Sequence, residues 1–253
     1  MSSSPFVAFL DADDEWLPTK LERQIAFLRA DPALGLVCSL CMISEPGAQG
    51  RDLVPVVSAP HSGRLFQHLV RNCFIFTPTV VVRRSCLEDV GLFNESLLTS
   101  EDFNLWLRIA ARWNIALIPE ILAITHKRRS GSLSSTVSPE QRLGNGVAAI
   151  EDVRSRCPQL IPAEERALRV ALAERLYFEG SFLLSAGAES SARTKLAASL
   201  KLQITHWRAL AKLGLSYLPT RAYHALAGSK RKVADRPLSE HSAPFQSRRS
   251  FLI

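Results

Sequence analysis

The stretch "FLDADDEWLPTKL", residues 9–21, places three carboxylates directly after a short apolar run: Asp11, Asp13 and Asp14. The run itself, "PFVAFL" at residues 5–10, has the character of a buried strand. Acidic side chains at the carboxyl end of such a strand indicate that the strand opens onto a site. This stretch therefore predicts both a buried strand and a cluster of negative charge beside it.

The flanking sequence predicts that strands and helices alternate. Residues 19–31 place Leu21, Ile25 and Leu28 at helical spacing with charged residues between them, so we expect a helix whose apolar side these residues form. Further strands are expected at 35–44, 78–86 and within 115–128, and helices at 63–73, 86–91 and 100–113. This alternation predicts an α/β sheet up to about residue 135.

The character of the sequence changes after Pro139, where strand signals end and Ala, Leu, Glu and Arg dominate. We expect helices at 140–156, 163–186, 189–202 and 206–226, arranged as helical hairpins that resemble a tetratricopeptide-like pair. The predicted organisation is an α/β domain at 1–135, an all-α helical module at 139–228 and a disordered basic tail at 229–253.

Composition and charge narrow the class of protein. Of the 253 residues 47% are hydrophobic and 22% are charged, and no apolar window of about 18 residues predicts a membrane span. The five cysteines are scattered, which suits reduced thiols in the cytoplasm. The last 26 residues supply +4 of the net charge of +7, so we expect weak peripheral attraction to an anionic membrane and no nucleic-acid partner.

Three kinds of chemistry place Asp-x-Asp at the end of a strand. A calcium loop of the EF-hand type is disfavoured by Trp16 at its turn and by Pro18 inside it. A phosphatase of the haloacid dehalogenase type would use Asp11 as nucleophile, but it has Thr or Val where this chain has Glu15. The third is transfer from a nucleoside-diphosphate sugar, where Asp11 and Asp13 hold Mg²⁺ or Mn²⁺ against the diphosphate.

Two ordered blocks favour the third interpretation. "FVAFLDADDEWLPTKLERQIAFL" resembles the central motif of family 2 glycosyltransferases, which have the GT-A fold, an α/β Rossmann-like sheet. "TVVVRRSCLEDVGLFNESLLTSEDFNLWLRIA" resembles the second half of the same domain, where an acidic pair opens a helix. The resemblance covers roughly residues 5–135 and implies inverting, metal-dependent transfer from a nucleoside-diphosphate sugar, with UDP-sugars expected.

The resemblance assigns roles to the acids of both blocks. Asp11 and Asp13 match the Asp-x-Asp motif, with Asp13 as the direct ligand of Mg²⁺ or Mn²⁺, and Asp11 and Asp14 would hold the ribose or metal-bound water. Asp102 matches the general base that removes the proton of an acceptor hydroxyl. Glu101 would contact the acceptor or support that base.

The chain departs from the family pattern in two places. Arg129 stands where many members have a His that reaches the metal, and it is a candidate contact to the diphosphate. The strand reading like "SVIIPTYN" and the units that hold the nucleoside are not in the sequence, so we expect a truncated, partial GT-A domain whose strand at residues 6–10 has an unpaired edge.

The expected setting is assembly of cell-surface polysaccharide or glycolipid at the inner face of a membrane, with a carbohydrate or lipid-linked acceptor. Two alternatives stay open at this point. The first is a non-catalytic remnant that binds a partner through its helical module. The second is the phosphatase with Asp11 as nucleophile.

Overall fold

A computed structural model describes residues 3–44, 54, 57, 59–126 and 136–218 of the chain. These form two compact units, the first comprising the described residues up to Ser138 together with Ala148–Leu168, and the second Pro139–Val147 together with the described residues from Arg169 onward. Arg129 and the tail at 229–253 lie outside the described residues. Within the part described, no helix is long and apolar enough to cross a membrane.

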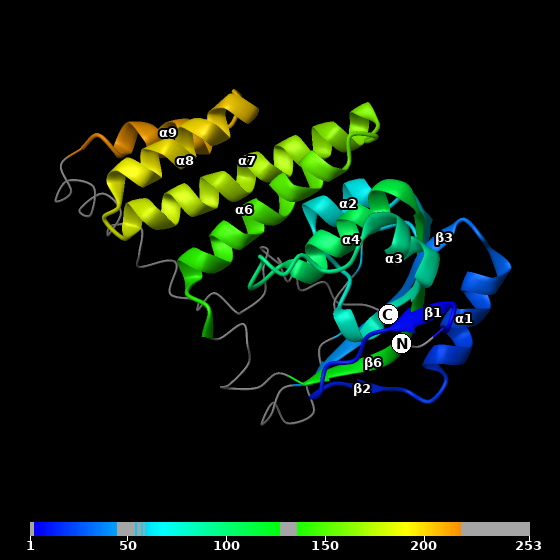
Figure 1. Ribbon diagram of the computed structural model, residues 1–253. Coiled ribbons are helices and arrows are strands. Elements are labelled where there is room, and N and C mark those ends of the chain that lie inside the picture. Colours follow the sequence, from blue (N-terminus) through cyan, green and yellow to red (C-terminus); the bar gives the residue numbers. More distant parts are fainter. Residues whose placement is uncertain (1–2, 45–53, 55–56, 58, 127–135, 219–253) are drawn as a thin grey trace, which may run out of the picture. The chain divides into compact units, whose positions relative to one another are not determined.

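The first unit is built around a mixed sheet with helices on both faces (Figure 1). Its elements are, in chain order, β1 (Phe6–Ala8), β2 (Glu15–Trp16), α1 (Lys20–Ala30), β3 (Leu34–Ser44), β4 (Ser62–Gly63), α2 (Phe66–Arg71), a 3₁₀ turn η1 (Thr77–Thr79), β5 (Val81–Arg83), α3 (Arg84–Val90), α4 (Glu101–Arg112) and β6 (Asn114–His126). The helices that follow are α6 (Pro139–Arg156), α7 (Pro162–Ser185), α8 (Glu189–Leu202) and α9 (Trp207–Leu215). The expected α/β sheet followed by helices is confirmed.

The sheet has six strands, ordered β1-β5-β3-β6-β2, with β4 paired to β6. Its centre is the parallel pair of β3 and β6, the two longest strands, and the other pairings are antiparallel. Strands that are buried on both faces read as continuous apolar runs, as "LGLVC" in β3 does. Among the described strands β1 bonds only to β5, so it is an edge strand, as expected.

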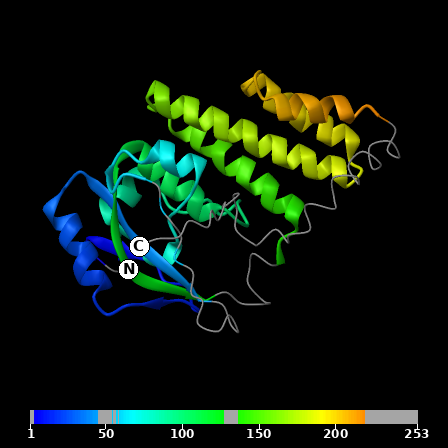
Figure 2. The same ribbon diagram turned by 180° about the vertical axis from the view of Figure 1, so that it is seen from behind.

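Helix α1 lies on one face of the sheet, and α2, α3 and α4 lie on the other (Figures 1 and 2). Between α1 and the sheet lies a cluster of buried apolar side chains: Leu28, Leu34, Val37, Val81, Ala116, Ile118 and Leu122. Helix α3 ends at Gly91, which has a φ of 83° and closes the helix in the conformation that glycine tolerates best. The sequence predicted this end.

The inward side of α1 differs from the one predicted. Leu28 is fully buried, but Leu21 is 38% exposed, and the residues buried with Leu28 are Lys20 and Gln24. The Gln24 amide donates hydrogen bonds to the carbonyls of Val37 (2.9 Å) and Thr79 (2.8 Å). Buried polar groups are tolerated when they find such partners, and these carbonyls come from segments distant in sequence.

One strand prediction also needs correction. The strand expected at 78–86 is only Val81–Arg83, because a 3₁₀ turn precedes it and α3 begins at Arg84. The region within 115–128, where one or two strands were expected, forms one strand over its described residues, β6, with irregular pairing to β3 near Leu40. That irregularity lets one long strand follow the twist of the sheet.

The second unit is helical, and α7 and α8 match the predicted helices closely. The helix predicted at 206–226 is shorter, because α9 ends at Leu215 and residues 216–218 form a turn; residues 219–226 lie outside the described residues. Helices α7 and α8 approach closely at Gly180, where an added Cβ would lie 2.9 Å from a carbon of Leu196. The Ser199 hydroxyl of α8 donates to the carbonyl of Ala173 (2.7 Å) and lies 2.9 Å from Nδ1 of His206. Small residues and paired polar groups therefore allow tight packing of these helices.

Candidate active site

The loop after β1 holds the first acidic block. Its backbone turns where the Asp14 amide donates to the Asp11 carbonyl (3.1 Å). The Asp14 carboxylate accepts hydrogen bonds from the backbone amide of His126 (3.2 Å) and the hydroxyl of Thr125 (3.4 Å). These contacts tie the loop to the carboxyl end of β6, beside the short pairing of β2 with the same strand.

The second acidic block opens helix α4. Ser100, just before the helix, has a φ of 67°, the only positive φ of a non-glycine residue among those the structure describes. Such a left-handed residue is uncommon and clusters at functional sites, where the surrounding structure holds it. The Asp102 carboxylate accepts hydrogen bonds from the Phe103 amide (2.6 Å) and from the hydroxyl of Thr77 in η1 (3.3 Å).

Three aromatic rings join the two blocks. Phe9, just before the first acids, makes edge contacts with Phe93 (centroids 5.5 Å apart) and with Trp106 of α4 (5.7 Å). Phe93 and Trp106 also meet, at 6.2 Å, and Trp106 is fully buried. Edge-to-face pairs of this kind are favourable beyond the area that they bury. The cluster therefore holds the end of β1 beside the first turns of α4.

The carboxylates of the two blocks lie close enough to affect one another electrostatically. Burial raises the pKa of Asp102, hydrogen bonds from Phe103 and Thr77 lower it, and the negative charge of Asp11 raises it further. The pKa of Glu101 is raised by burial first, and then by Asp102 and Asp11. Like charges disfavour each other's ionisation, so Asp11 lies within electrostatic range of the α4 acids.

The carboxylates of the first block also have raised pKa values. Burial and then the neighbouring Asp13 raise the pKa of Asp11. Burial raises the pKa of Asp14 to about 6, with Asp11 and Asp13 adding to the shift and the bond from His126 opposing it. A carboxylate cluster that disfavours its own charge is a favourable site for a cation.

The donor chemistry of the first block fits Mg²⁺ or Mn²⁺ held together with a substrate. Among the described residues no group of three or more His, Cys, Asp or Glu is arranged to hold a metal by itself. Mg²⁺ is commonly bound by one or two carboxylates together with substrate phosphates and water. Asp11 and Asp13 are such a pair of carboxylates; the pKa of Asp11 is raised first by burial and then by the negative charge of Asp13, which a cation would offset.

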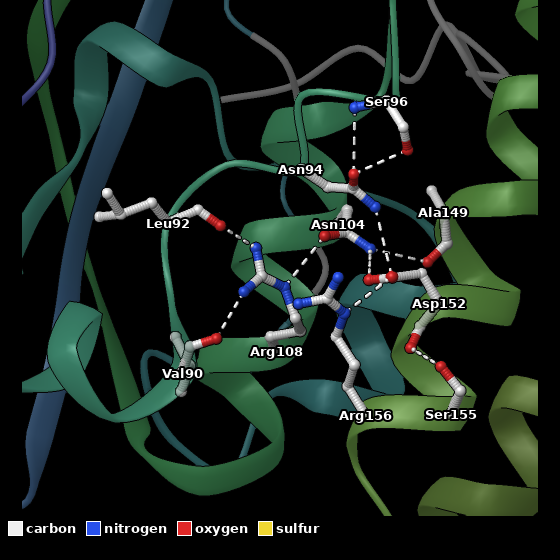
Figure 3. A network of polar contacts seen from close by, with 10 residues as sticks. All are labelled: Val90, Leu92, Asn94, Ser96, Asn104, Arg108, Ala149, Asp152, Ser155 and Arg156. Atoms are coloured by element: carbon white, nitrogen blue, oxygen red, sulfur yellow. Dashed lines mark hydrogen bonds and ion pairs between the residues drawn. The ribbon is translucent and has the colours of Figure 1, made fainter.

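A buried polar network supports α4 from behind (Figure 3). Arg108 donates from Nε to the Asn104 side chain (3.0 Å) and from its terminal nitrogens to the carbonyls of Val90 and Leu92. The Asn104 amide donates to Asp152 of α6 (2.9 Å) and to the carbonyl of Ala149 (3.0 Å).

The network also reaches the loop that leads into α4. Asn94 donates to Asp152 (3.2 Å) and accepts from both the amide (3.1 Å) and the hydroxyl (2.7 Å) of Ser96 (Figure 3). Arg156 donates to the same Asp152 (2.8 Å). Residues of α6 thus belong to the support of the acidic pair, although the sequence placed that helix in a separate module.

The structure brings together Asp11, Glu101 and Asp102 and places Asp14 in the adjoining loop. Thr77, which bonds to Asp102, was missed as an individual residue. The only feature of the sequence that could have indicated Thr77 is its position beside a proline in an apolar loop, "NCFIFTPT". Trp16 is a second contact to this loop, since its indole donates to the carbonyl of Pro78 (2.8 Å). Arg129 lies outside the described residues, and His126 contacts Glu15 (2.9 Å).

Comparison with known proteins agrees with this arrangement. The family model described as glycosyl transferase family 2 matches residues 1–91. An uncharacterized glycosyltransferase of Rickettsia bellii is 32% identical over 111 residues, which are 44% of this chain and 16% of that protein. The Escherichia coli UDP-Glc:alpha-D-GlcNAc-diphosphoundecaprenol beta-1,3-glucosyltransferase WfgD is 31% identical over 117 residues, 46% of this chain and 43% of that protein.

A solved structure shares the fold. The crystal structure of S. aureus TarS in complex with UDP-GlcNAc aligns with a TM-score of 0.56 at 19% identity, covering 91% of this chain and 69% of that one. The matches cover less than half of the length of both curated relatives. Residues 1–91 thus match the glycosyl transferase family 2 model, and the chain shares its fold with a solved glycosyltransferase structure.

Proposed function

We propose that this chain carries out inverting glycosyl transfer from a nucleoside-diphosphate sugar to a hydroxyl acceptor. The observation that carries the proposal is the meeting of Asp11 with Glu101 and Asp102, each of which has its pKa raised by burial and by neighbouring carboxylates. Clustered acids with raised pKa values are a feature of catalytic sites. The family match favours this reaction over the phosphatase alternative.

Asp102 is the proposed general base. A raised pKa makes its carboxylate a stronger base, and the bonds from Thr77 and Phe103 fix its position. The acceptor oxygen forms a bond to the anomeric carbon while the bond from that carbon to the diphosphate oxygen breaks. The acceptor proton passes to the Asp102 carboxylate, and the electron pair leaves with the nucleoside diphosphate. One displacement of this kind inverts the anomeric configuration. Glu101 would contact the acceptor.

Asp11, Asp13 and Asp14 form the proposed donor side. Asp11 and Asp13 would hold Mg²⁺ or Mn²⁺, which when bound neutralises charge on the departing diphosphate. Asp11 and Asp14 would accept hydrogen bonds from the ribose hydroxyls or from metal-bound water. The contacts of Asp14 to the end of β6 keep the donor loop against the sheet. We retain Arg129 as a candidate contact to the diphosphate.

The donor and acceptor classes are inferred from relatives. The printed name of WfgD describes a UDP-glucose donor and a diphosphoundecaprenol-linked acceptor for that protein. We infer a UDP-sugar donor and a carbohydrate or lipid-linked acceptor for this chain, in synthesis of cell-surface polysaccharide or glycolipid on the cytoplasmic side of a membrane. The proposed helical module at 139–228 and basic tail at 229–253 would lie outside the transfer chemistry.

Isothermal titration with UDP-glucose and UDP-GlcNAc, with and without Mn²⁺, tests the donor site. We expect heat of binding that requires the metal ion. Asp13→Ala should weaken the metal-dependent binding of the donor. Asp102→Asn should retain donor binding and reduce kcat by about 10²–10⁴-fold. Asp89→Asn is the matched control, because Asp89 pairs with Arg112 (2.6 Å) and belongs to no part of the proposed site.

Two results would contradict these roles. Equal loss of donor affinity in Asp13→Ala and Asp102→Asn would show that Asp102 does not act in the chemical step. Absence of binding to any nucleoside diphosphate by a folded chain would favour the non-catalytic alternative, in which the helices bind a partner.

A further inference from the structure

Helix α9 presents an apolar stripe to solvent. The stripe consists of Trp207, Leu210, Ala211 and Gly214 of α9, which recur at intervals of three and four residues, and it continues into Tyr217 and Leu218 of the turn after the helix; all six residues are exposed. Trp207 is 72% exposed, Leu210 60% and Tyr217 68%. Large exposed side chains gathered on one face are unlike the scattered apolar residues of an ordinary surface.

The opposite side of α9 already has its partner within the second unit. Ala209 is fully buried in a cluster with Tyr177 and Leu196, and Leu213 packs against that cluster. Leu215 packs against a neighbouring cluster that includes Leu183. The fold of this unit therefore does not account for the exposed stripe, which is the second apolar side of a helix that is already packed.

The charge of the chain changes sign near this helix. Residues 1–188 contain 19 Lys and Arg against 21 Asp and Glu, so they are slightly acidic. Residues 189–253 contain 12 Lys and Arg against 3 Asp and Glu, which gives them a net charge of +9. The region that contains α9 thus carries the whole positive excess of the protein.

The positive charge lies beside the stripe in the described part of this region. The guanidinium of Arg193 lies over the ring of Tyr217, 4.4 Å from its centroid. Arg208 follows Trp207 in the sequence, but its guanidinium lies over the rings of Tyr177 (4.8 Å) and Phe178 (5.8 Å), on the packed side of α9. A short helix with Trp and Leu on one face and cations at its sides is the pattern of a segment that lies in the interface of an anionic bilayer.

We propose that the α9 stripe docks on the surface of an anionic lipid bilayer. Trp and Tyr are enriched at membrane interfaces, where an apolar body and a polar tip are both accommodated. Each Lys or Arg near an anionic surface adds a favourable and salt-sensitive attraction. The occupant is a lipid surface because the basic excess of residues 189–253 complements anionic headgroups and would repel a second copy of itself.

The size of the stripe also favours a lipid surface over a protein partner. Its helical part, the nine residues of α9, is roughly 14 Å long and no wider than the ~10 Å diameter of a helix. A stable protein–protein interface buries about 800 Å² on each partner, more than this stripe offers. A bilayer imposes no such minimum because burial of a few side chains adds to the electrostatic attraction.

Co-sedimentation with vesicles tests the proposal on the whole chain. The probes are vesicles of phosphatidylcholine alone and of equal parts phosphatidylcholine and phosphatidylglycerol, at low and high salt. We expect binding to the mixed vesicles only, weakened by salt. Trp207→Ser combined with Leu210→Ser should weaken it at least tenfold, equivalent to about 1.4 kcal/mol. Leu92→Ser is the matched control, because Leu92 is 70% exposed and lies in the first unit.

Fluorescence gives an independent readout. Trp207→Phe keeps an apolar ring in the stripe, so it should still sediment with mixed vesicles. It should lose the blue shift in Trp emission that we expect the unchanged chain to show when those vesicles are added. Retention of the blue shift in Trp207→Phe would assign it to another tryptophan and overturn the proposal.

Three other results would also overturn it. Equal binding by the double Ser variant and the unchanged chain would place the contact elsewhere, for example in the basic tail. Equal binding to neutral vesicles would remove the electrostatic part of the argument. A dimer that the double Ser variant converts to a monomer, with vesicle binding unchanged, would show that the stripe joins two copies of the chain.

Discussion

Helices α4 and α9 both contain a tryptophan and an apolar side, but they use them in opposite ways. In α4 every residue from Phe103 to Ala111 is buried, including the polar Asn104 and Arg108. In α9 only Ala209 is buried, while Trp207 and Leu210 face solvent. The first helix lies against the sheet and receives partners on several sides, whereas the second is packed on one side only.

The difference shows that the apolar pattern of a helix does not reveal which part of the protein its apolar side contacts. Periodicity predicts which residues of a helix share a face, and it does so for both helices. Whether that face meets protein depends on elements that are distant in sequence. For α4 these are the end of β1, the loop after α3 and part of α6.

The largest expected contrast is between the two tryptophans. Trp106→Ala should lower the free energy of unfolding by about 3–5 kcal/mol, because it opens a cavity in the cluster with Phe9 and Phe93. Among the described residues the indole nitrogen of Trp106 has no hydrogen-bond partner, which favours the lower end of that range. Trp207→Ala should change it by less than about 0.5 kcal/mol. Denaturant unfolding measures both, and equal losses would contradict the comparison.

The polar network behind α4 should give the next largest effect. Asn104→Ala removes the partner of Arg108 Nε and the donor to Asp152, so we expect a loss of about 1–3 kcal/mol in unfolding free energy. A fall in kcat with KM nearly unchanged would indicate that the network also positions Asp102.

The control for this prediction shares the same acidic partner. Arg156→Ala also removes a contact to Asp152, but the Arg156 side chain is 55% exposed and the pair spans one helical turn. Exposed pairs of this kind contribute about 0.5 kcal/mol or less. An equally large loss of unfolding free energy for Arg156→Ala would show that the stabilisation does not come specifically from the buried contacts of α4.

The acidic site of the first unit should make the stability of the protein depend on pH. Helix α9 has no acid in its first turn and offers no comparable effect. The pKa of Asp14 is raised to about 6 from 3.8, so the folded state binds its proton more tightly than the unfolded state does. Asp14 therefore costs stability progressively as pH rises through that interval. Asp14→Asn should raise Tm relative to the unchanged chain at pH 7 and leave it nearly unchanged at pH 3.5. A constant difference across this range would contradict the assignment.

The smallest expected effect is on α9 itself. Leu210→Ser should alter unfolding free energy by less than about 0.5 kcal/mol, because the side chain is 60% exposed. Leu107→Ser in α4, at a fully buried position, should cost several-fold more. Thermal unfolding in the absence of lipid measures both. A large loss for Leu210→Ser would show that the stripe is covered within the chain.

Local sequence was sufficient for several features. Helices α6, α7 and α8 begin and end near the predicted residues because apolar spacing, prolines and Gly187 act over a few residues, whereas α9 ends before the predicted residue 226. The end of α3 at Gly91 was predicted for the same reason. The two acidic blocks were also found from short patterns, since each follows or opens a regular element.

The tertiary structure decided which residues became partners. Lys20 and Gln24, and not Leu21, form the inward side of α1 with Leu28, because carbonyls of Val37, Thr79 and Val80 lie there to receive them. The contact of Thr77 with Asp102 likewise joins segments that no local pattern connects.

The sequence by itself determined the kinds of elements and the positions of the acids. Only the tertiary structure decided that Asp11 lies beside the acids of α4 and that the side of α9 carrying Trp207 faces solvent. The physical reason is the distance along the chain over which each effect acts. Propensity and capping act within a turn or two of the chain, whereas burial and charge coupling depend on whichever distant segments the fold brings within a few ångströms.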